Sequence, residues 1–249
     1  MARIIAVASG KGGVGKTTVV ANLCAALARL GENVIAMDAN LTTSNLGLHL
    51  GIPLYPVTLQ DVINNRARVK DALYYHHAGF RILPADLSMT KILIPNSHQL
   101  IDVLYKLTDT DYVIIDCAAG LGREALAAVE AADELVTVAT PDLPSMTDAL
   151  KLGRLAEEFE TVNLGVILNR ARFDSYEISP NGVQDFLNLQ VLRIIPEDKD
   201  VKKALAYKMP VINYNPKAKA SREFFALAKL LTGKEIKNPG LFSRLFGFG

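Results

Sequence analysis

The segment Gly10-Lys11-Gly12-Gly13-Val14-Gly15-Lys16-Thr17 decides the fold of this chain. It fits the pattern G-x-x-x-x-G-K-[ST], directly follows an apolar run at residues 4–8 and opens a helical stretch at residues 16–30. A strand, a glycine loop and a helix in this order predict a phosphate-binding loop. A chance glycine turn is the plain alternative, but it does not explain why the pattern and its context occur together.

The residue types in this loop predict how it would hold a nucleotide. Glycines let backbone N–H groups curl around phosphate oxygens, and the helix N-terminus adds its positive dipole end. We expect Lys16 to reach the β- and γ-phosphates and the Thr17 hydroxyl to ligate Mg²⁺. The residues expected to contact ATP are Gly10, Lys11, Gly12, Gly13, Val14, Gly15, Lys16, Thr17 and Thr18.

Outward from the loop, short apolar runs alternate with longer helical stretches. Strands are expected at residues 4–8, 34–37, 112–115, 135–139, 164–168 and 191–195, and helices at 16–30, 97–107, 123–132, 145–159, 201–207 and 221–231. Continuous apolar runs are typical of strands covered on both faces, and strand–helix alternation is typical of parallel pairing. The sequence therefore predicts an α/β fold with a doubly wound, mostly parallel sheet and helices on both faces. We place this domain at residues 1–233 and a linker with an apolar tail at 234–249.

Composition narrows the class of protein. The 249 residues carry a net charge of only +1, unlike the basic excess of a dedicated nucleic-acid binder. Cys24 and Cys117 are far apart, which favours a reduced cytosolic protein without a disulfide framework. The four histidines, including the adjacent His76 and His77, show no metal spacing, and we interpret them as structural or surface residues. No apolar run approaches the roughly 20 residues that span a bilayer, so we expect any membrane association to be peripheral.

Two aspartates follow predicted strands. Asp38 comes after residues 34–37, and Asp116 comes after residues 112–115. The carboxyl ends of parallel strands meet at one edge of the sheet, where ligands bind. We expect Thr17, Asp38 and Asp116 to hold Mg²⁺, with Asp116 in the Walker B position and acting through a water molecule.

The second lysine of the loop, Lys11, is not needed by an ordinary phosphate loop. With it, the segment resembles the deviant Walker A motif Gly-Lys-Gly-Gly-x-Gly-Lys-Thr of the MinD/ParA ATPases, and the resemblance extends over nearly the whole chain. In that family the additional lysine crosses a nucleotide-sandwich dimer and contacts the phosphates of the other subunit, a charge supplied in trans. The resemblance implies a homodimer in the ATP-bound state, with Lys11 and Lys16 as catalytic residues.

Asn40 departs from the family pattern. The family usually carries an acidic residue two positions after the one matching Asp38, on a switch loop that orients the attacking water. An amide can hydrogen-bond a water molecule, but it carries no charge and cannot act as a base. We place Asn40 at the catalytic position and predict slow hydrolysis with a long-lived ATP state.

The resemblance also implies contacts to the adenine base. Asn169-Arg170 and Pro196-Glu197-Asp198 each follow a predicted strand, and in the family these segments flank the adenine. The asparagine there hydrogen-bonds the base edge, and an amide offers both a donor and an acceptor. On local sequence alone, each segment would be an ordinary turn.

The end of the chain is apolar. Leu241, Phe242, Leu245 and Phe246 recur on one face of a helix, and Phe248 follows. This segment resembles the amphipathic membrane-targeting tail of the family's MinD branch, which implies contact with the anionic inner surface of the cell membrane. Two tails on one dimer would raise avidity about 10²–10⁴-fold. The alternative is that the tail packs on its own domain.

Together these observations favour a cytoplasmic ATPase that dimerises on ATP, associates peripherally with the cytoplasmic face of the membrane and positions a protein partner, for example at the division site. Four alternatives stay open: a ParA-type partition ATPase that uses DNA as its surface, a flagellar or array-positioning ATPase, a metal-cluster carrier, and a nucleotide-gated binding module with negligible turnover. The near-neutral charge and apolar tail disfavour the DNA-bound alternative, and the missing C-x-x-C pair disfavours the cluster carrier.

Overall fold

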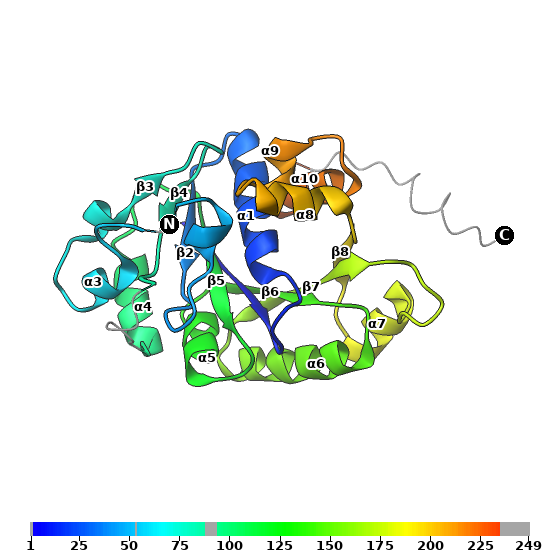
Figure 1. Ribbon diagram of the computed structural model, residues 1–249. Coiled ribbons are helices and arrows are strands. Elements are labelled where there is room, and N and C mark those ends of the chain that lie inside the picture. Colours follow the sequence, from blue (N-terminus) through cyan, green and yellow to red (C-terminus); the bar gives the residue numbers. More distant parts are fainter. Residues whose placement is uncertain (1, 53, 88–93, 235–249) are drawn as a thin grey trace.

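The structure is a computed structural model that describes residues 2–52, 54–87 and 94–234 (Figure 1). Its strands are β1 (Arg3–Ser9), β2 (Val34–Asp38), β3 (Tyr74–Tyr75), β4 (Arg81–Leu83), β5 (Tyr112–Ala119), β6 (Glu134–Ala139), β7 (Val162–Ala171) and β8 (Val191–Pro196). They form one sheet in the order β3-β4-β2-β5-β1-β6-β7-β8. The pairs are parallel except for β3, which runs antiparallel to β4. The predicted mostly parallel sheet is confirmed.

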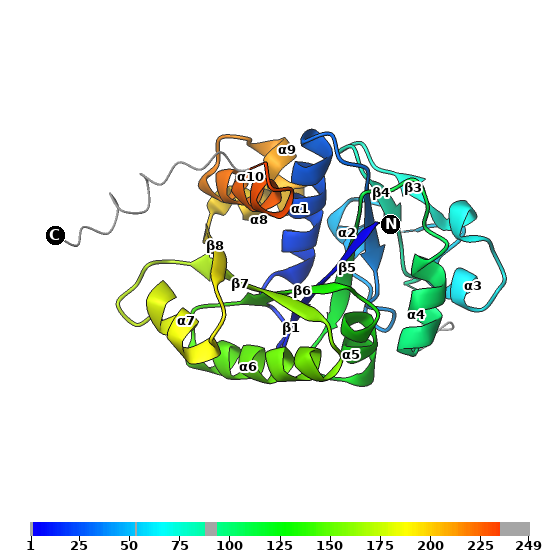
Figure 2. The same ribbon diagram turned by 180° about the vertical axis from the view of Figure 1, so that it is seen from behind.

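Helices cover both faces of the sheet, as Figures 1 and 2 show from opposite sides. One apolar layer includes residues of α1 (Lys16–Arg29), α2 (Leu46–His49), α8 (Lys199–Ala206), α9 (Val211–Tyr214) and α10 (Lys219–Leu231). The opposite layers include residues of α3 (Leu59–Ile63), α4 (Ser97–Leu104), α5 (Arg123–Glu130), α6 (Leu143–Glu158) and α7 (Pro180–Leu187). A short 3₁₀ turn, η1 (Val69–Ala72), precedes β3. This is the doubly wound arrangement that the strand–helix alternation predicted.

Helix α1 is the central helix of the first layer. Val19, Val20, Leu23 and Leu27 are fully buried against the sheet. The helix follows Gly15, whose φ of 94° lies in the left-handed region that favours glycine. Because Gly15 also ends the phosphate loop, the same residue fixes the loop shape and the start of α1.

Some boundaries differ from those predicted. Strands β3 and β4 were not predicted, because runs of 2 and 3 residues are too short to show a period. Asn96, rather than Ser97, caps α4: its side chain accepts from the Gln99 N–H at 2.9 Å. Helix α6 begins before residue 145, because the Asp142 side chain caps it and a proline occupies its first turn.

The described chain ends just past α10. Lys234 donates to the Leu30 carbonyl at 3.2 Å and pairs with Glu32 at 2.5 Å. The residues predicted to contact a membrane lie outside the described part of the chain: Leu241, Phe242, Leu245, Phe246 and Phe248. The domain boundary between residues 233 and 234 also stays a prediction. In the three described segments, residues 2–52, 54–87 and 94–234, no helix is long and apolar enough to cross a bilayer.

Candidate nucleotide-binding site

The loop between β1 and α1 packs so closely against neighbouring elements that two of its glycines are sterically required. A Cβ on Gly10 would lie 2.3 Å from the Cβ of Asp148 on α6. A Cβ on Gly15 would lie 2.4 Å from the side-chain nitrogen of Asn169, a residue of β7. The loop is therefore held against α6 on one side and β7 on the other, and a larger residue at either position would displace it.

Lys16 extends into the site from the first turn of α1. Its ammonium group donates to the Ser9 hydroxyl at 3.0 Å, and the residue is buried. Burial lowers the pKa of Lys16, while the nearby Asp116 carboxylate acts against this shift. A buried ammonium next to a glycine loop is a fixed positive charge that an anionic ligand would neutralise.

Asp38 and Asp116 face each other across neighbouring strands. The parallel pairing of β2 with β5 places them in direct register, and both are almost completely buried. Burial raises the pKa of both carboxyl groups, and the charge of Asp38 raises the pKa of Asp116 further. Asp116 lies within β5 rather than just after it, since the strand continues to Ala119.

The two carboxylates differ in how they are satisfied. Asp38 accepts from the Ser44 hydroxyl at 2.6 Å and from backbone N–H groups of the following loop. Among the described residues, Asp116 Oδ1 has no hydrogen-bond partner, although a hydrogen bond with the Thr17 side chain lowers the pKa of this carboxyl group. An unsatisfied buried carboxylate oxygen beside a threonine hydroxyl fits a hard cation such as Mg²⁺. Thr17 and Asp116 thus offer oxygen atoms that suit Mg²⁺, and the hydrogen bonds of Asp38 hold the following loop in place. The metal roles of Thr17, Asp38 and Asp116 stay predictions.

Asn40 lies on this loop and lines the cavity above the glycines. Its amide donates to the Thr43 carbonyl at 2.7 Å, and its oxygen accepts from the Thr43 N–H at 3.2 Å and hydroxyl at 3.0 Å. The residue is therefore where the sequence predicted it, at the rim of the site. In this state its side chain shapes the loop, and its role toward a water molecule stays a prediction.

The cavity has a volume of about 510 Å³, within the range of small-molecule sites. Its wall combines the glycine loop, the loop after β2, helix α2 and one residue of α8. The residues that line it are Gly12, Gly13, Gly15, Lys16, Thr17, Thr18, Asn40, Thr43, Asn45, Leu48, His49, Cys117, Ala119 and Leu205. A cavity of this size around a phosphate-binding loop can hold a nucleotide.

The two segments predicted to flank the base meet in an adjoining cleft. The residues that line it are Asn169, Arg170, Pro196, Glu197 and Asp198, together with Gly15 of the loop and residues of α1, α8 and α10. The Asn169 amide donates to the Val14 carbonyl at 2.6 Å, and Arg170 donates to the Gly13 carbonyl at 2.9 Å. Both residues therefore brace the glycine loop, and their contact with adenine stays a prediction.

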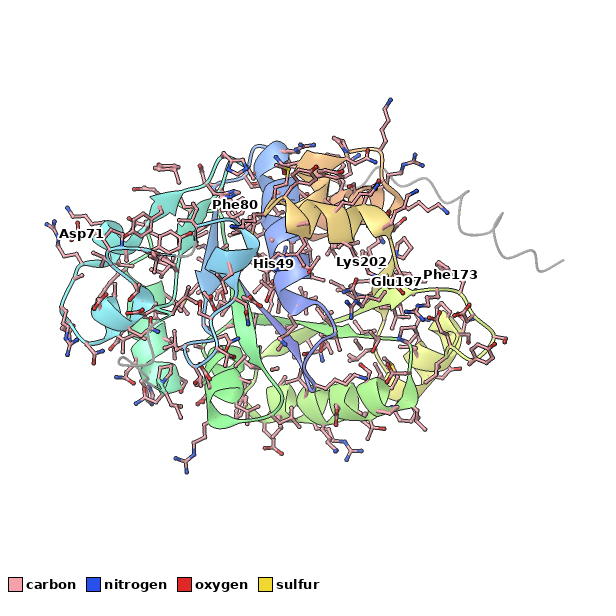
Figure 3. The ribbon with its side chains drawn as sticks, viewed as in Figure 1. His49, Asp71, Phe80, Phe173, Glu197 and Lys202 are labelled. Carbon is pink, nitrogen blue, oxygen red and sulfur yellow. The ribbon has the colours of Figure 1, made fainter. Side chains whose placement is uncertain are left out.

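Glu197 and Asp198 also have structural roles. Glu197 forms ion pairs with Arg172 and with Lys202, the latter at 3.1 Å, and these cations lower the pKa of Glu197 to about 2 (Figure 3). Asp198 caps α8 by accepting from the Asp200 N–H at 2.9 Å. These contacts give both acidic side chains a structural role that does not require a bound nucleotide.

Lys11 has a different partner from Lys16 and does not line the cavity. Its ammonium group contacts Asp142 at 2.9 Å, and both side chains stay partly exposed, at 35% and 43%. Asp142 also accepts from the Ser145 N–H at 2.9 Å and so caps α6. Asp142 was not predicted as a site residue, although it lies close behind a predicted strand, the same signal that identified Asp38 and Asp116.

Two further site residues were missed. Ser9 directly precedes the loop and contacts Lys16. His49, interpreted from sequence as structural or surface, lies on α2 with Nε2 3.2 Å from the Thr18 hydroxyl and lines the cavity (Figure 3). No local motif marks either residue, so only the tertiary structure reveals them.

The doubly wound sheet and the loop at the end of β1 define a P-loop nucleotide-binding protein. Comparison with known proteins specifies the family. Residues 5–211 match the CobQ/CobB/MinD/ParA nucleotide binding domain family, and the chain belongs to this family. The resemblance to the MinD/ParA ATPases stated from sequence is confirmed.

Individual relatives cover almost the whole chain. An uncharacterized ATP-binding protein of Methanocaldococcus jannaschii is 38% identical over 95% of this chain and 90% of its own length. The septum site-determining protein MinD of Thermotoga maritima is 35% identical over 95% of this chain and 90% of its own. The solved structure of septum site-determining MinD from Pyrococcus horikoshii, complexed with Mg-ADP, is 35% identical, with a TM-score of 0.89 over 95% of this chain and 100% of that one.

These relatives confirm the fold and, for the family, the predicted cofactors. The family is one of nucleotide-binding P-loop ATPases, and a relative with the same fold holds Mg-ADP. ATP and Mg²⁺ are therefore the cofactors of this class of protein. Which residues hold them in this chain stays a prediction: the phosphate loop for the nucleotide, and Thr17, Asp38 and Asp116 for Mg²⁺.

Proposed function

We propose that this protein is a MinD-like ATPase that dimerises when it binds ATP, associates with a membrane surface and resets by hydrolysis. The observation that carries the proposal is the pair of lysines in one loop. Lys16 is buried inside its own site, whereas Lys11 forms a partly exposed contact with Asp142. Since Lys11 does not line its own chain's cavity, its charge can serve a site on a second copy once the ion pair with Asp142 opens.

Each residue has a defined part in this proposal. Backbone N–H groups of the loop and the Lys16 ammonium bind and orient the phosphates. Thr17 and Asp116 hold Mg²⁺, which when bound offsets the charge of the phosphate oxygens. Asn40 orients the attacking water by a hydrogen bond but cannot remove its proton, so hydrolysis is slow. Lys11 of the second copy approaches the transferring phosphoryl group and stabilises its charge.

Dimerisation is tested by light scattering with Mg·ATP. The wild type is expected to double in mass with ATP but not with ADP. The variant Lys11→Ala should bind nucleotide and stay monomeric, while Lys106→Ala, at an exposed position in the turn after α4, serves as the matched control. An ATP-dependent dimer of Lys11→Ala as stable as the wild type would contradict the role of Lys11.

Membrane association rests on the tail and on the relatives named for septum placement, and its residues lie outside the described part of the chain. The apolar side chains of one tail bind weakly, and two on one dimer bind with higher avidity. Liposome flotation with ATP, with ADP and with a chain ending at Asn238 tests this. Flotation that is independent of ATP or of the tail would contradict the switch, and ATP-dependent, salt-sensitive retention on DNA would favour the partition alternative.

A further inference from the structure

Helix α2 places a histidine against the first turn of α1. His49 is the last residue of α2, and its Nε2 lies 3.2 Å from the Thr18 hydroxyl. Both residues line the cavity that contains Lys16 and Thr17. Figure 3 shows His49 between α2 and the neighbouring α1. The mechanism proposed above gives this imidazole no role.

Thr18 has polar groups to offer a ligand. It belongs to the first turn of α1, where a backbone N–H has no partner within the helix. Its carbonyl accepts from the Asn22 amide at 2.8 Å, and Asn22 in turn accepts from the Ile212 N–H at 3.2 Å. The carbonyl is thus anchored toward α9, which fixes the threonine and leaves its hydroxyl at the cavity wall beside His49.

The direction of the hydrogen bond between these two side chains decides what Thr18 can do. A threonine hydroxyl has one proton, and a phosphate oxygen can only accept. If Thr18 donates to His49, it has no proton left for a phosphate. If His49 donates from Nε2–H, the Thr18 proton is free to point at a phosphate oxygen.

The surroundings keep the imidazole neutral, so that only one of its nitrogens carries a proton. Burial lowers the pKa of His49 to about 4, well below physiological pH. A neutral ring has one donor and one acceptor nitrogen, and the hydrogen bond that it makes selects the tautomer. A phosphate on the far side of Thr18 requires the Nε2–H tautomer.

We propose that His49 is a positioning residue of the nucleotide site: its Nε2–H donates to the Thr18 hydroxyl and so turns the Thr18 proton toward a phosphate oxygen. The inference rests on the proposed function, since it takes the nucleotide to occupy this cavity. The contact has a second consequence. Helix α2 follows the loop that Asp38 anchors through Ser44 and the Leu46 N–H, so His49 joins that loop to α1.

A double-mutant cycle tests the proposal, with Kd measured for a fluorescent ADP analogue in the presence of Mg²⁺. His49→Leu and Thr18→Val should each weaken binding about 3–10-fold, the effect of one hydrogen bond. The double variant should bind no more weakly than the weaker single variant, because both changes break the same chain of hydrogen bonds. His49→Gln, which presents an amide donor near the Nε2 position, should bind within about twofold of wild type.

The exposed His77 provides the matched control, and His77→Leu should leave Kd unchanged. Unliganded melting temperatures show which variants fold, and if His49→Leu does not, the loss expected for Thr18→Val and the near wild-type binding expected for His49→Gln still test the hydrogen bond. Any one of three results would overturn the positioning role. His49→Leu could bind the analogue as tightly as the wild type, the losses of the two single variants could multiply in the double variant, or His49→Gln could bind as weakly as His49→Leu. Failure of the wild type to bind the analogue would instead overturn the proposed function.

Discussion

Asp116 is the residue whose burial is hardest to explain without a ligand. In the described part of the chain its Oδ1 atom accepts no hydrogen bond, and the residue is 2% exposed. A buried, unsatisfied carboxylate oxygen is costly, and burial together with the charge of Asp38 raises its pKa. Such a group is retained where a cation or another ligand satisfies it, which is the basis of the metal role proposed here.

The raised pKa of Asp116 predicts a dependence of stability on pH. The pKa of Asp116 in the folded protein lies above the ordinary value of 3.8. Its contribution to the free energy of unfolding is therefore fully present below pH 3.8 and is lost as pH rises through the folded pKa. Without Mg²⁺ or nucleotide, the free energy of unfolding should therefore fall as pH rises from about 4 to about 7, between the ordinary pKa and the folded pKa. Asp116→Asn should reduce this fall by about 1–3 kcal/mol. Urea unfolding in EDTA measures both, and equal pH slopes for the two proteins would contradict the prediction.

Asn40 predicts slow turnover, and an acidic side chain at the same position should speed it. Aspartate keeps the acceptor toward the Thr43 N–H but loses the amide that donates to the Thr43 carbonyl. The substituted carboxylate can orient the water and polarise it. Asn40→Asp should raise single-turnover hydrolysis about 10²-fold, a typical effect of a positioned base. Asn40→Ala is the control, and an unchanged rate in Asn40→Asp would show that slow hydrolysis has another cause.

Besides β1 and α1, which are continuous with the phosphate loop, and β7, which donates hydrogen bonds to it, α6 also contacts the loop. It contacts the loop through Gly10, where Asp148 leaves no room for a Cβ, and through the ion pair of Lys11 with Asp142 at its N-terminus. A change in the loop that frees Lys11 therefore removes one of the two contacts that hold α6 to the loop. This makes α6 the element through which the state of the loop can reach the surface.

The ion pair should hold Lys11 back in the monomer. Asp142→Asn removes the charge but keeps the cap of α6, because asparagine is as good a capping residue as aspartate. A partly exposed pair contributes about 0.2–1 kcal/mol, so the variant should tighten ATP-dependent dimerisation up to about fivefold. Analytical ultracentrifugation with Mg·ATP measures this. Weaker dimerisation of Asp142→Asn would mean that Asp142 supports the dimer rather than competing with it.

At the scale of the molecule, strand order places the site. The chain passes from β1 to β2 on one side of β1, and later from β5 to β6 on the other side. Such a reversal opens a crevice at the carboxyl edge of a doubly wound sheet. The phosphate loop, Asp38, Asp116 and Asp142 all lie near this edge, at or close behind the ends of strands that neighbour each other in the sheet.

Nucleotide binding should stabilise the whole domain. At a ligand concentration of about 100 times Kd, binding adds about 2.7 kcal/mol to the free energy of unfolding. For a chain of 249 residues this corresponds to a rise in melting temperature of about 5–10 °C with Mg·ADP. Lys16→Gln should abolish the rise and EDTA should reduce it, both followed by differential scanning fluorimetry. A full shift in Lys16→Gln would contradict the central role of the loop.

The local sequence determined the glycine loop, the six longer strands and most helix positions. Each of these depends on residues that are close together in the chain: apolar runs, a helix period, and a lysine and threonine at fixed spacing after a glycine. The two aspartates were also predicted, because the rule that ligands bind at the carboxyl edge needs only the strand ends. The roles of Lys11 and Asn40 came from a family resemblance rather than from local physics.

Tertiary structure alone decided which of these side chains meet. Lys11 and Asp142 are 131 positions apart, and Thr18 and His49 are 31 apart. Their contacts depend on how α6 and α2 pack beside the loop. No sequence pattern within α6, α2 or the loop predicts that these side chains meet. The unsatisfied oxygen of Asp116 also results from tertiary packing. The strand register places Asp116 beside Asp38, and no donor among the described residues reaches its Oδ1 atom. The sequence therefore determined the kind of site, and packing decided its geometry.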